Sequence, residues 1–338
     1  SYMINPTLGY VKINRFAEST FLEFEKSIEN LLSEGASNLV LDLRDNSGGF
    51  LQIAEQIADE FLEDGTLILF TKNKTNEIEK IFATAKGRFE KAEVYVLINE
   101  NSASASEIVA GALQDNDKGI IIGRRSFGKG LVQQEMDLGD GSAIRLTTSR
   151  YYTPTGRSIQ RSYDKGSEAY YDDYYQRLEH RAVDTLQSDL LADSLKFTTP
   201  KGKIVYGGGG IIPDVYVPYD ANFNNDIIEF LKASGIMDFF VFEYLDSKRA
   251  KYTSLSETEF LTTFEISEAI YQKFVSNFSD RMNMKNEEIN PYKNAIEILL
   301  KSAFAKQLFG DNTAAKVLST FDPMLQKTND LEAVVISN

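Results

Sequence analysis

Two strongly apolar segments, each followed by a turn of small and polar residues and then by an amphipathic segment, restrict what this chain can fold into. Residues 39–43 read Leu-Val-Leu-Asp-Leu and residues 94–99 read Val-Tyr-Val-Leu-Ile-Asn, which is typical of buried strands. The segments that follow carry apolar residues at helical spacing, namely Leu51, Ala54, Ile57, Ala58 and Phe61 after the first strand and Ile108, Val109, Ala112 and Leu113 after the second. This alternation predicts an α/β fold built in layers.

Further elements extend the same pattern. Residues 8–14 alternate like a strand, and a capping-box pair, Thr20 with Glu23, precedes an amphipathic helix. Residues 120–122 form a short apolar strand. Two later strands, 131–138 and 142–152, flank a Gly-Asp-Gly turn and predict a hairpin. We therefore expect antiparallel additions to the α/β core.

The composition changes after about residue 162. Residues 163–193 are rich in Tyr, Asp, Glu and Gln and lack strand periodicity, so we interpret about 163–205 as a partly helical insertion. Residues 202–217 return to a strand pattern, with Gly207–Gly210 as a tight, close-packed connection. From about residue 224 the apolar spacing is helical. We predict a core over 1–217, with the insertion, and a helical region over 218–338.

Composition excludes several classes of function. The chain of 338 residues has no cysteine and a single histidine, His180, which excludes a disulfide scaffold, a cysteine nucleophile and a multi-histidine zinc site. Its net charge of −14 argues against nucleic acid as a partner. There is no apolar run long enough to span a membrane and no signal-peptide pattern at the start, where we expect an upstream part to be missing.

Three serines lie in the turn between residues 94–99 and the following helix: Ser102, Ser104 and Ser106. A serine at a helix start is close to free N–H groups and to the positive end of the helix dipole, where an oxyanion is stabilised. The alternative is structural, because Ser104 with Glu107 also forms a capping-box pattern.

Two other glycine-rich segments carry candidate chemistry. Lys129 lies between two glycines, which allow close approach to other backbone, and a buried lysine can act as a neutral base. Gln133 is close enough along the chain to hydrogen-bond its amine. Gly48 and Gly49 follow a buried strand and precede a helix, where N–H groups can form an anion site or an oxyanion hole. An exposed turn lysine and a simple strand-to-helix turn are the structural alternatives.

Taken together, these segments closely resemble the C-terminal processing peptidases, or tail-specific proteases, of the S41 serine peptidase family. The similar segments are, in order, 42–49, 101–115, 126–133, 152–160 and 209–214. They span about residues 8–217. The resemblance implies the spiral β-β-α core shared with Clp proteases and crotonases, and an activity in the periplasm or another extracytoplasmic compartment.

The resemblance also implies roles for individual residues. Ser104 becomes the nucleophile, Lys129 its general base, and Gln133 the residue that orients the lysine. The N–H of Ala105, with that of Gly48 or Gly49, forms the oxyanion hole. The supporting positions are Glu107, Asp115 and Ser126.

The function that follows is a serine endopeptidase that cleaves polypeptides near the C-terminus through an acyl-enzyme, without a cofactor. A non-catalytic peptide-binding or scaffold relative is the main alternative, and a crotonase-type acyl-CoA enzyme a further one. The PDZ domain usual in the family is not recognisable here, so we assign no PDZ-based substrate capture. The apolar faces of the helical tail favour a homo-oligomer.

Overall fold

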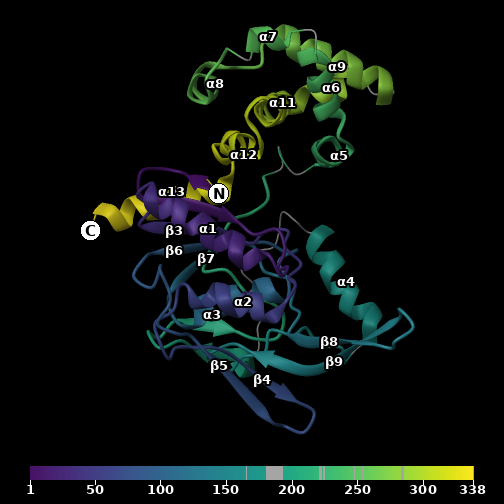
Figure 1. Ribbon diagram of the computed structural model, residues 1–338. Helices are drawn as coiled ribbons and strands as arrows, with labels where there is room; N and C mark the ends of the chain where they lie inside the picture. The colour runs from purple at the N-terminus through teal and green to yellow at the C-terminus, as the bar shows by residue number, and fades with distance from the viewer. Residues whose placement is uncertain are drawn as a thin grey trace. The chain divides into compact units, whose positions relative to one another are not determined.

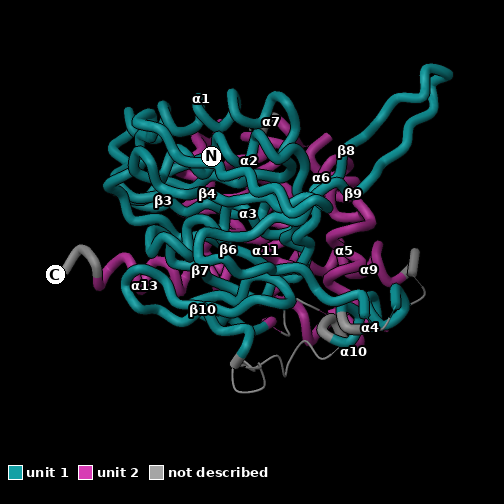
Figure 2. The backbone as a smooth tube through the Cα atoms, turned by 90° about the horizontal axis from the view of Figure 1, so that it is seen from below, with its two compact units in different colours: residues 1–218 teal, residues 219–338 magenta. Residues whose placement is uncertain are grey.

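The computed structural model describes residues 1–164, 166–179, 193–220, 223, 225–246, 248–252, 254–282 and 285–337. The chain divides into two compact units, residues 1–218 and 219–338 (Figure 2). Unit 1 is a mixed α/β fold, and the regular elements in the described residues of unit 2 are all helices. The predictions of an α/β fold and of a helical C-terminal region are therefore confirmed.

The main sheet of unit 1 has the strand order β1-β2-β3-β6-β7-β12. Its strands are β1 (Tyr2–Met3), β2 (Leu8–Lys12), β3 (Asn38–Asp42), β6 (Val94–Ile98), β7 (Gly119–Gly123) and β12 (Val215–Tyr216). All neighbours from β2 to β12 are parallel, and β1 is antiparallel to β2. Because β3 and β6 are adjacent and parallel, the loops that follow them lie at the same edge of the sheet.

Three helices connect these strands: α1 (Thr20–Ser33), α2 (Leu51–Asp59) and α3 (Ala105–Asp115). Every residue of α3 is buried. Figure 1 shows α2 and α3 between strands β6 and β7 of the main sheet and strands β4 and β5 of a second sheet, and α3 contacts both β7 and β4. Small residues such as Ala110, Gly111 and Ala112 allow this central position, because the neighbouring elements must pack close to a helix that is covered on all sides.

The second sheet is antiparallel, with the order β5-β4-β9-β8. Its strands are β4 (Leu67–Asn73), β5 (Ile78–Phe82), β8 (Leu131–Asp137) and β9 (Ala143–Tyr152). The predicted β8–β9 hairpin is confirmed, and Figure 2 shows it projecting from the rest of unit 1. The sequence pattern did not predict β4 and β5. β5 reads Ile-Glu-Lys-Ile-Phe and is mostly exposed, so it carries no core signal of its own.

The insertion contains α4 (Gly166–Glu179), a 3₁₀ turn at Asp193–Leu195, and a hairpin of β10 (Lys196–Thr198) and β11 (Ile204–Tyr206). The predicted partly helical character is confirmed where it is described; His180 lies outside the described residues. Residues 207–210 form the close-packed connection that the sequence predicted. A Cβ on Gly210 would lie 2.5 Å from the backbone O of Ser126.

Unit 2 has its own core, which combines aliphatic side chains with aromatic ones such as Phe240, Phe274 and Phe304. Its helices are α5 (Asp226–Ser234), α6 (Ile236–Asp246), α7 (Arg249–Tyr252), α8 (Glu257–Thr263), α9 (Glu268–Met282), α10 (Asn286–Ile289), α11 (Lys293–Phe309), α12 (Asp311–Ser319) and α13 (Pro323–Ser337), with a 3₁₀ turn at Asn290–Tyr292. None of the helices in the described part of the chain combines the length and apolar character needed to cross a membrane.

Candidate active site

Backbone hydrogen bonds join three loops of unit 1. The loop after β3 meets the loop after β6, where the Ala103 N–H donates to Asn46 O at 3.0 Å. The loop after β7 joins them, because the Phe127 N–H donates to Ser102 O at 2.9 Å. Gly48, Ser104 and Lys129, which lie far apart in the sequence, therefore belong to one cluster of loops.

The three serines of the second loop differ in what their hydroxyls do. Ser102 and Ser106 are fully buried, and their hydroxyls donate to Leu43 O and Asn46 O, each at 2.8 Å. Ser104 is half-buried, and its hydroxyl forms no hydrogen bond within the described residues. Only Ser104 of these three therefore presents an unengaged hydroxyl.

The backbone of Ser104 is strained. Its φ of 56° and ψ of −111° belong to a region that glycine usually occupies, and the residue immediately precedes α3. Ser104 and Glu107 occupy the capping-box positions that the sequence predicted, and the Ser104 N–H donates to Glu107 Oε2 at 2.9 Å. The Ser104 hydroxyl itself makes no capping hydrogen bond to the helix. In other folds, a strained serine on a sharp strand-to-helix turn can serve as a nucleophile.

Glu107 links the serine and lysine loops. Its carboxylate is fully buried, and Oε2 accepts the N–H of Ser104 and the N–H of Lys129, both at 2.9 Å. Oε1 accepts the Gly128 N–H at 2.7 Å and the Ser126 hydroxyl at 2.5 Å. Burial raises the pKa of Glu107, and these four donors act in the opposite direction. One carboxylate thus fixes the backbone on both sides of the cluster.

Lys129 is half-buried and its amine donates to Gln133 Oε1 at 3.1 Å. Desolvation lowers the pKa of Lys129, the positive charge of Arg145 lowers it further, and Glu107 opposes both. Within the described residues the Lys129 amine and the Ser104 hydroxyl form no hydrogen bond with each other. The Tyr151 hydroxyl lies 2.9 Å from Lys129 O and 3.2 Å from Ser104 O, so it lies between the two backbones.

The glycine loop packs directly on the serine turn. A Cβ on Gly48 would lie 2.7 Å from Ala103 O and 2.9 Å from Ser104 Cβ, and the φ of Gly48 is 99°. Any other residue there would displace the serine turn. The side chain of Asn46 holds the loop, since its Oδ1 accepts the Gly48 N–H at 2.9 Å and its Nδ2 donates to Ile13 O at 2.7 Å.

Ser126 connects the lysine loop to the segment that follows the insertion. Its hydroxyl donates to Glu107 and accepts the Ile211 N–H at 2.6 Å, while its own N–H donates to Ile211 O at 3.0 Å. The Ser126 hydroxyl thus makes one hydrogen bond as a donor and one as an acceptor, and both hold the loops together.

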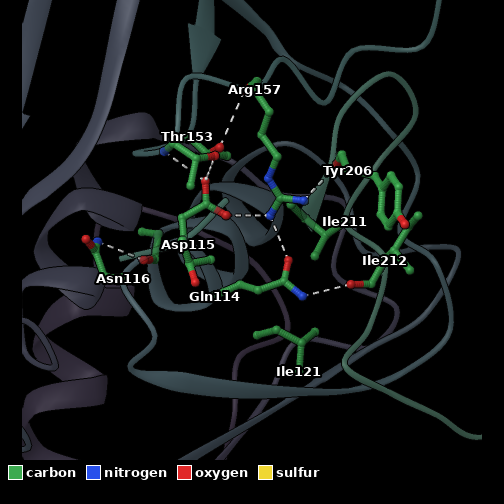
Figure 3. A network of polar contacts seen from close by, with 12 residues as sticks. Gln114, Asp115, Asn116, Ile121, Thr153, Arg157, Tyr206, Ile211 and Ile212 are labelled. Atoms are coloured by element: carbon green, nitrogen blue, oxygen red, sulfur yellow. Dashed lines mark hydrogen bonds and ion pairs between the residues drawn. The ribbon is translucent and has the colours of Figure 1, made fainter. Parts of the chain in front are cut away.

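Asp115 lies elsewhere. It is the last residue of α3, about 16 Å along the helix axis from Ser104 at 1.5 Å per residue. Figure 3 shows its carboxylate facing Arg157, with Oδ1 2.7 Å from Nη2, and both side chains are fully buried. Oδ2 accepts the Thr155 N–H and hydroxyl. Asp115 thus supports the far end of α3 and does not meet the loop cluster.

The structure places the other predicted site residues in one cluster: Gly48, Gly49, Ser104, Ala105, Glu107, Ser126, Lys129 and Gln133. Sequence reasoning missed Tyr151 and Asn46. Asn46 lies within the glycine-loop segment, and its position two residues before Gly48 is the usual spacing of an Asx turn. Tyr151 lies one residue before the end of β9 and carries no such signal.

Comparison with known proteins identifies a family for most of unit 1. Residues 7–166, which contain the whole loop cluster, match the sequence profile of peptidase family S41. This domain belongs to peptidase family S41. A second match, over residues 228–310 in unit 2, is to a family of unknown function, DUF8443.

Relatives of the S41 domain include processing proteases from bacteria and plants. The carboxy-terminal-processing protease of Bartonella bacilliformis is 42% identical over 163 residues, which are 47% of this chain and 38% of that protein. The chloroplastic carboxyl-terminal-processing peptidase 1 of Arabidopsis thaliana is 37% identical over 45% of this chain and 31% of its own length. The chain thus spans less than two fifths of these relatives.

Among solved structures, the photosystem II D1 C-terminal processing protease is 35% identical and gives a TM-score of 0.42. The match covers 45% of this chain and 39% of that one.

Proposed function

We propose that this chain is a serine endopeptidase that cleaves polypeptides near their C-terminus, with Ser104 as nucleophile and Lys129 as general base. One observation carries the proposal: the buried Glu107 carboxylate binds the N–H groups of both Ser104 and Lys129, next to the one serine hydroxyl of the turn that is not engaged. Membership of the S41 domain and the names of its relatives support the reaction class.

The first step is attack on the peptide carbonyl. Neutral Lys129 Nζ accepts the proton of the Ser104 hydroxyl as Oγ bonds to the carbonyl carbon. This transfer requires the two side chains to come within hydrogen-bond distance when substrate binds, as catalytic pairs commonly do only in the complex. Gln133 holds the amine through a neutral amide, which positions it without adding a negative charge that would favour the ammonium form.

The tetrahedral intermediate then collapses. Its C–N bond breaks, and Lys129 returns the proton to the leaving amine, which leaves an ester on Ser104. A water molecule attacks this ester while Lys129 accepts its proton; the bond between the acyl carbon and Ser104 Oγ then breaks, Lys129 returns the proton to Oγ, and the carboxylic acid is released. One base serves both halves, so the reaction needs no histidine.

The oxyanion donors in this proposal are the N–H groups of Ala105 and Gly49. Gly48 is the weaker candidate, because its N–H already donates to Asn46 Oδ1. Gly48 O accepts the N–H of Phe16, and Phe50 donates to Phe16 O. Gly49 lies between these two bonds in a parallel bridge, so its own N–H points away from Phe16.

Three further expectations belong to the same proposal. The spiral core of Clp proteases and crotonases fits a sheet whose successive loops converge on one site. We expect an extracytoplasmic location, although relatives from bacteria and from a chloroplast do not single out the periplasm. A non-catalytic scaffold would not need the unengaged Ser104 hydroxyl or the lowered pKa of Lys129, so that alternative is disfavoured.

A serine-reactive fluorophosphonate probe tests the proposal. We expect mass spectrometry to locate the modification on Ser104 of the wild-type chain. Ser104→Ala should remove both the modification and the hydrolysis of unfolded casein. Ser102→Ala and Ser106→Ala are the controls, and each should keep measurable labelling. Casein hydrolysis at the wild-type rate by Ser104→Ala would refute the assignment.

A further inference from the structure

Helix α4, which belongs to the insertion, is anchored on the loop that carries Lys129. The buried guanidinium of Arg161 lies between two aromatic rings, 4.3 Å from the ring centroid of Phe127 and 4.0 Å from that of Tyr170. Phe127 lies two residues before Lys129, and Tyr170 belongs to α4. Arg161 also donates through Nη1 to Tyr170 O at 3.0 Å, and through its backbone N–H to Gly128 O at 3.1 Å. A desolvated cation between two rings is a strong contact.

The same helix is anchored on the loop that carries Ser104. The Tyr174 hydroxyl donates to Asn101 Oδ1 at 2.6 Å, three residues before Ser104. The Tyr174 ring also packs on Phe127, with centroids 5.2 Å apart. One tyrosine therefore contacts both the serine loop and the lysine loop.

Asn101 extends this chain of contacts to the third loop. Its Nδ2 donates to Asp45 Oδ1 at 2.8 Å, and Asp45 lies three residues before Gly48. Asp45 has a φ of 61°, and its carboxylate also accepts Asn99 Nδ2 at 2.8 Å. The tyrosine, the asparagine and the aspartate thus connect α4 to the loop that carries the proposed oxyanion donor.

These contacts occupy one face of α4. Tyr170 and Tyr174 are four residues apart, so they lie on the same side of the helix. Tyr171 and Tyr175 also lie four residues apart, on a different side, and are 51% and 56% exposed. The helix therefore uses one pair of tyrosines on the loop cluster, and the second pair remains accessible to solvent.

We propose that α4 is a positioning element for the proposed peptidase reaction. Through Tyr174 and the contacts of Arg161 with the Phe127 and Tyr170 rings, it holds the nucleophile, base and oxyanion loops in their relative places. Catalytic groups must be placed to a fraction of an ångström, and a fixed helix that contacts two of the loops directly and the third through Asn101 limits their relative motion. The inference rests on the proposed function of Ser104 and Lys129.

The test compares two substitutions that each remove one hydroxyl from the full chain. Tyr174→Phe keeps the ring on Phe127 but loses the hydrogen bond to Asn101, and Tyr175→Phe is the matched control on the exposed side. We expect Tyr174→Phe to slow the first-order reaction of Ser104 with saturating fluorophosphonate by about three- to tenfold, as expected for one net hydrogen bond. The concentration for half-saturation should not change, and Tyr175→Phe should match the wild type.

A double-mutant cycle separates positioning through Asn101 from a general loss of stability. In an Asn101→Ala background, Tyr174→Phe should cause no further decrease, because its partner is already absent. Additive effects, or a Tyr174→Phe rate equal to that of the wild type, would overturn the inference while leaving Ser104 labelling intact. Absence of labelling in the wild type would instead overturn the proposed function, and the inference with it.

Discussion

At the scale of single residues, the serine turn shows what the sequence can and cannot decide. Ser102, Ser104 and Ser106 occupy equivalent positions in a small-residue segment, and only the resemblance to a known family distinguished Ser104. In the structure the hydroxyls of Ser102 and Ser106 bond to carbonyls of the neighbouring strand loop. Those contacts join residues about 60 positions apart, so no local pattern could reveal them.

Lys129 determines the expected pH dependence. Its pKa is lowered from the ordinary lysine value, first by desolvation, and the base must be neutral to accept the Ser104 proton. Raising the pH through this lowered pKa increases the fraction of neutral Lys129. We therefore expect kcat/KM to rise with pH in a single step, and this rising limb of the profile should lie at lower pH than for an unperturbed lysine. Measuring kcat/KM for casein-derived peptides across the alkaline range checks this.

Three variants control the assignment of that limb. Lys129→Arg should be inactive, because a guanidinium stays protonated. Arg145→Gln should move the limb to higher pH, since it removes a positive charge that disfavours the lysine ammonium. His180→Ala should leave the profile unchanged, and loss of an inflection near about pH 6.5 in that variant would identify His180 as the base instead.

Loss of the Glu107 carboxylate should reduce Ser104 labelling far more than loss of an ordinary buried carboxylate. Glu107→Gln replaces one acceptor oxygen with an NH₂ group, which cannot accept any of the N–H or O–H donors around it. We expect Ser104 labelling to fall by about 10- to 100-fold, the range for hydrogen bonds to a charged group. Glu60→Gln, at a buried carboxylate that pairs with Arg88, is the control and should label normally.

At the scale of elements, the two ends of α3 contact different parts of unit 1. The N-terminal end presents Ser104 and Ala105 to the loop cluster, while the C-terminal end holds the Asp115–Arg157 pair (Figure 3). Asp115 was expected to support the site because it belongs to segment 101–115, which resembles the nucleophile segment of the family. An eleven-residue helix separates the two ends of this segment, which only the fold makes visible.

This separation predicts a stability effect without a catalytic effect. Asp115→Asn leaves Arg157 as an uncompensated buried charge, which costs about 3–5 kcal/mol of the free energy of unfolding. Urea denaturation should show that loss. Ser104 labelling, corrected for the folded fraction, should stay within about twofold of the wild type. A decrease as large as that of Glu107→Gln would mean that Asp115 acts on the site.

The second sheet shows a limit of pattern reading at the same scale. The β8–β9 hairpin was predictable because alternation and a Gly-Asp-Gly turn coincide. β4 and β5 were missed, although Leu67-Ile68-Leu69-Phe70 is an apolar run. β5 has little burial, and β4 is stabilised by pairing with the distant β9, so the signal is largely tertiary.

At the scale of the whole molecule, the two units have separate cores. The core of unit 1 ends with Ile211 and that of unit 2 begins with Ile228. The S41 match covers most of the α/β unit, and every residue of the loop cluster belongs to it. The helical periodicity of residues 224–338 predicted helices there but no catalytic residues.

Unit 2 should instead mediate self-association, which stays a prediction from the sequence. Helix α6 supplies a physical reason, because it is apolar on more than one side. Met237, Phe240 and Val241 are buried in the unit core, while Phe239 and Phe242 are 47% and 54% exposed. A helix with large apolar groups on all sides usually has a second face to bury.

Light scattering should therefore find an oligomer for the full chain and a monomer for residues 1–218. Phe239→Ser combined with Phe242→Ser should dissociate the full chain, whereas Leu22→Ser, at an exposed leucine of unit 1, should not. A monomeric full chain would rule out the assembly and leave the exposed phenylalanines without this explanation.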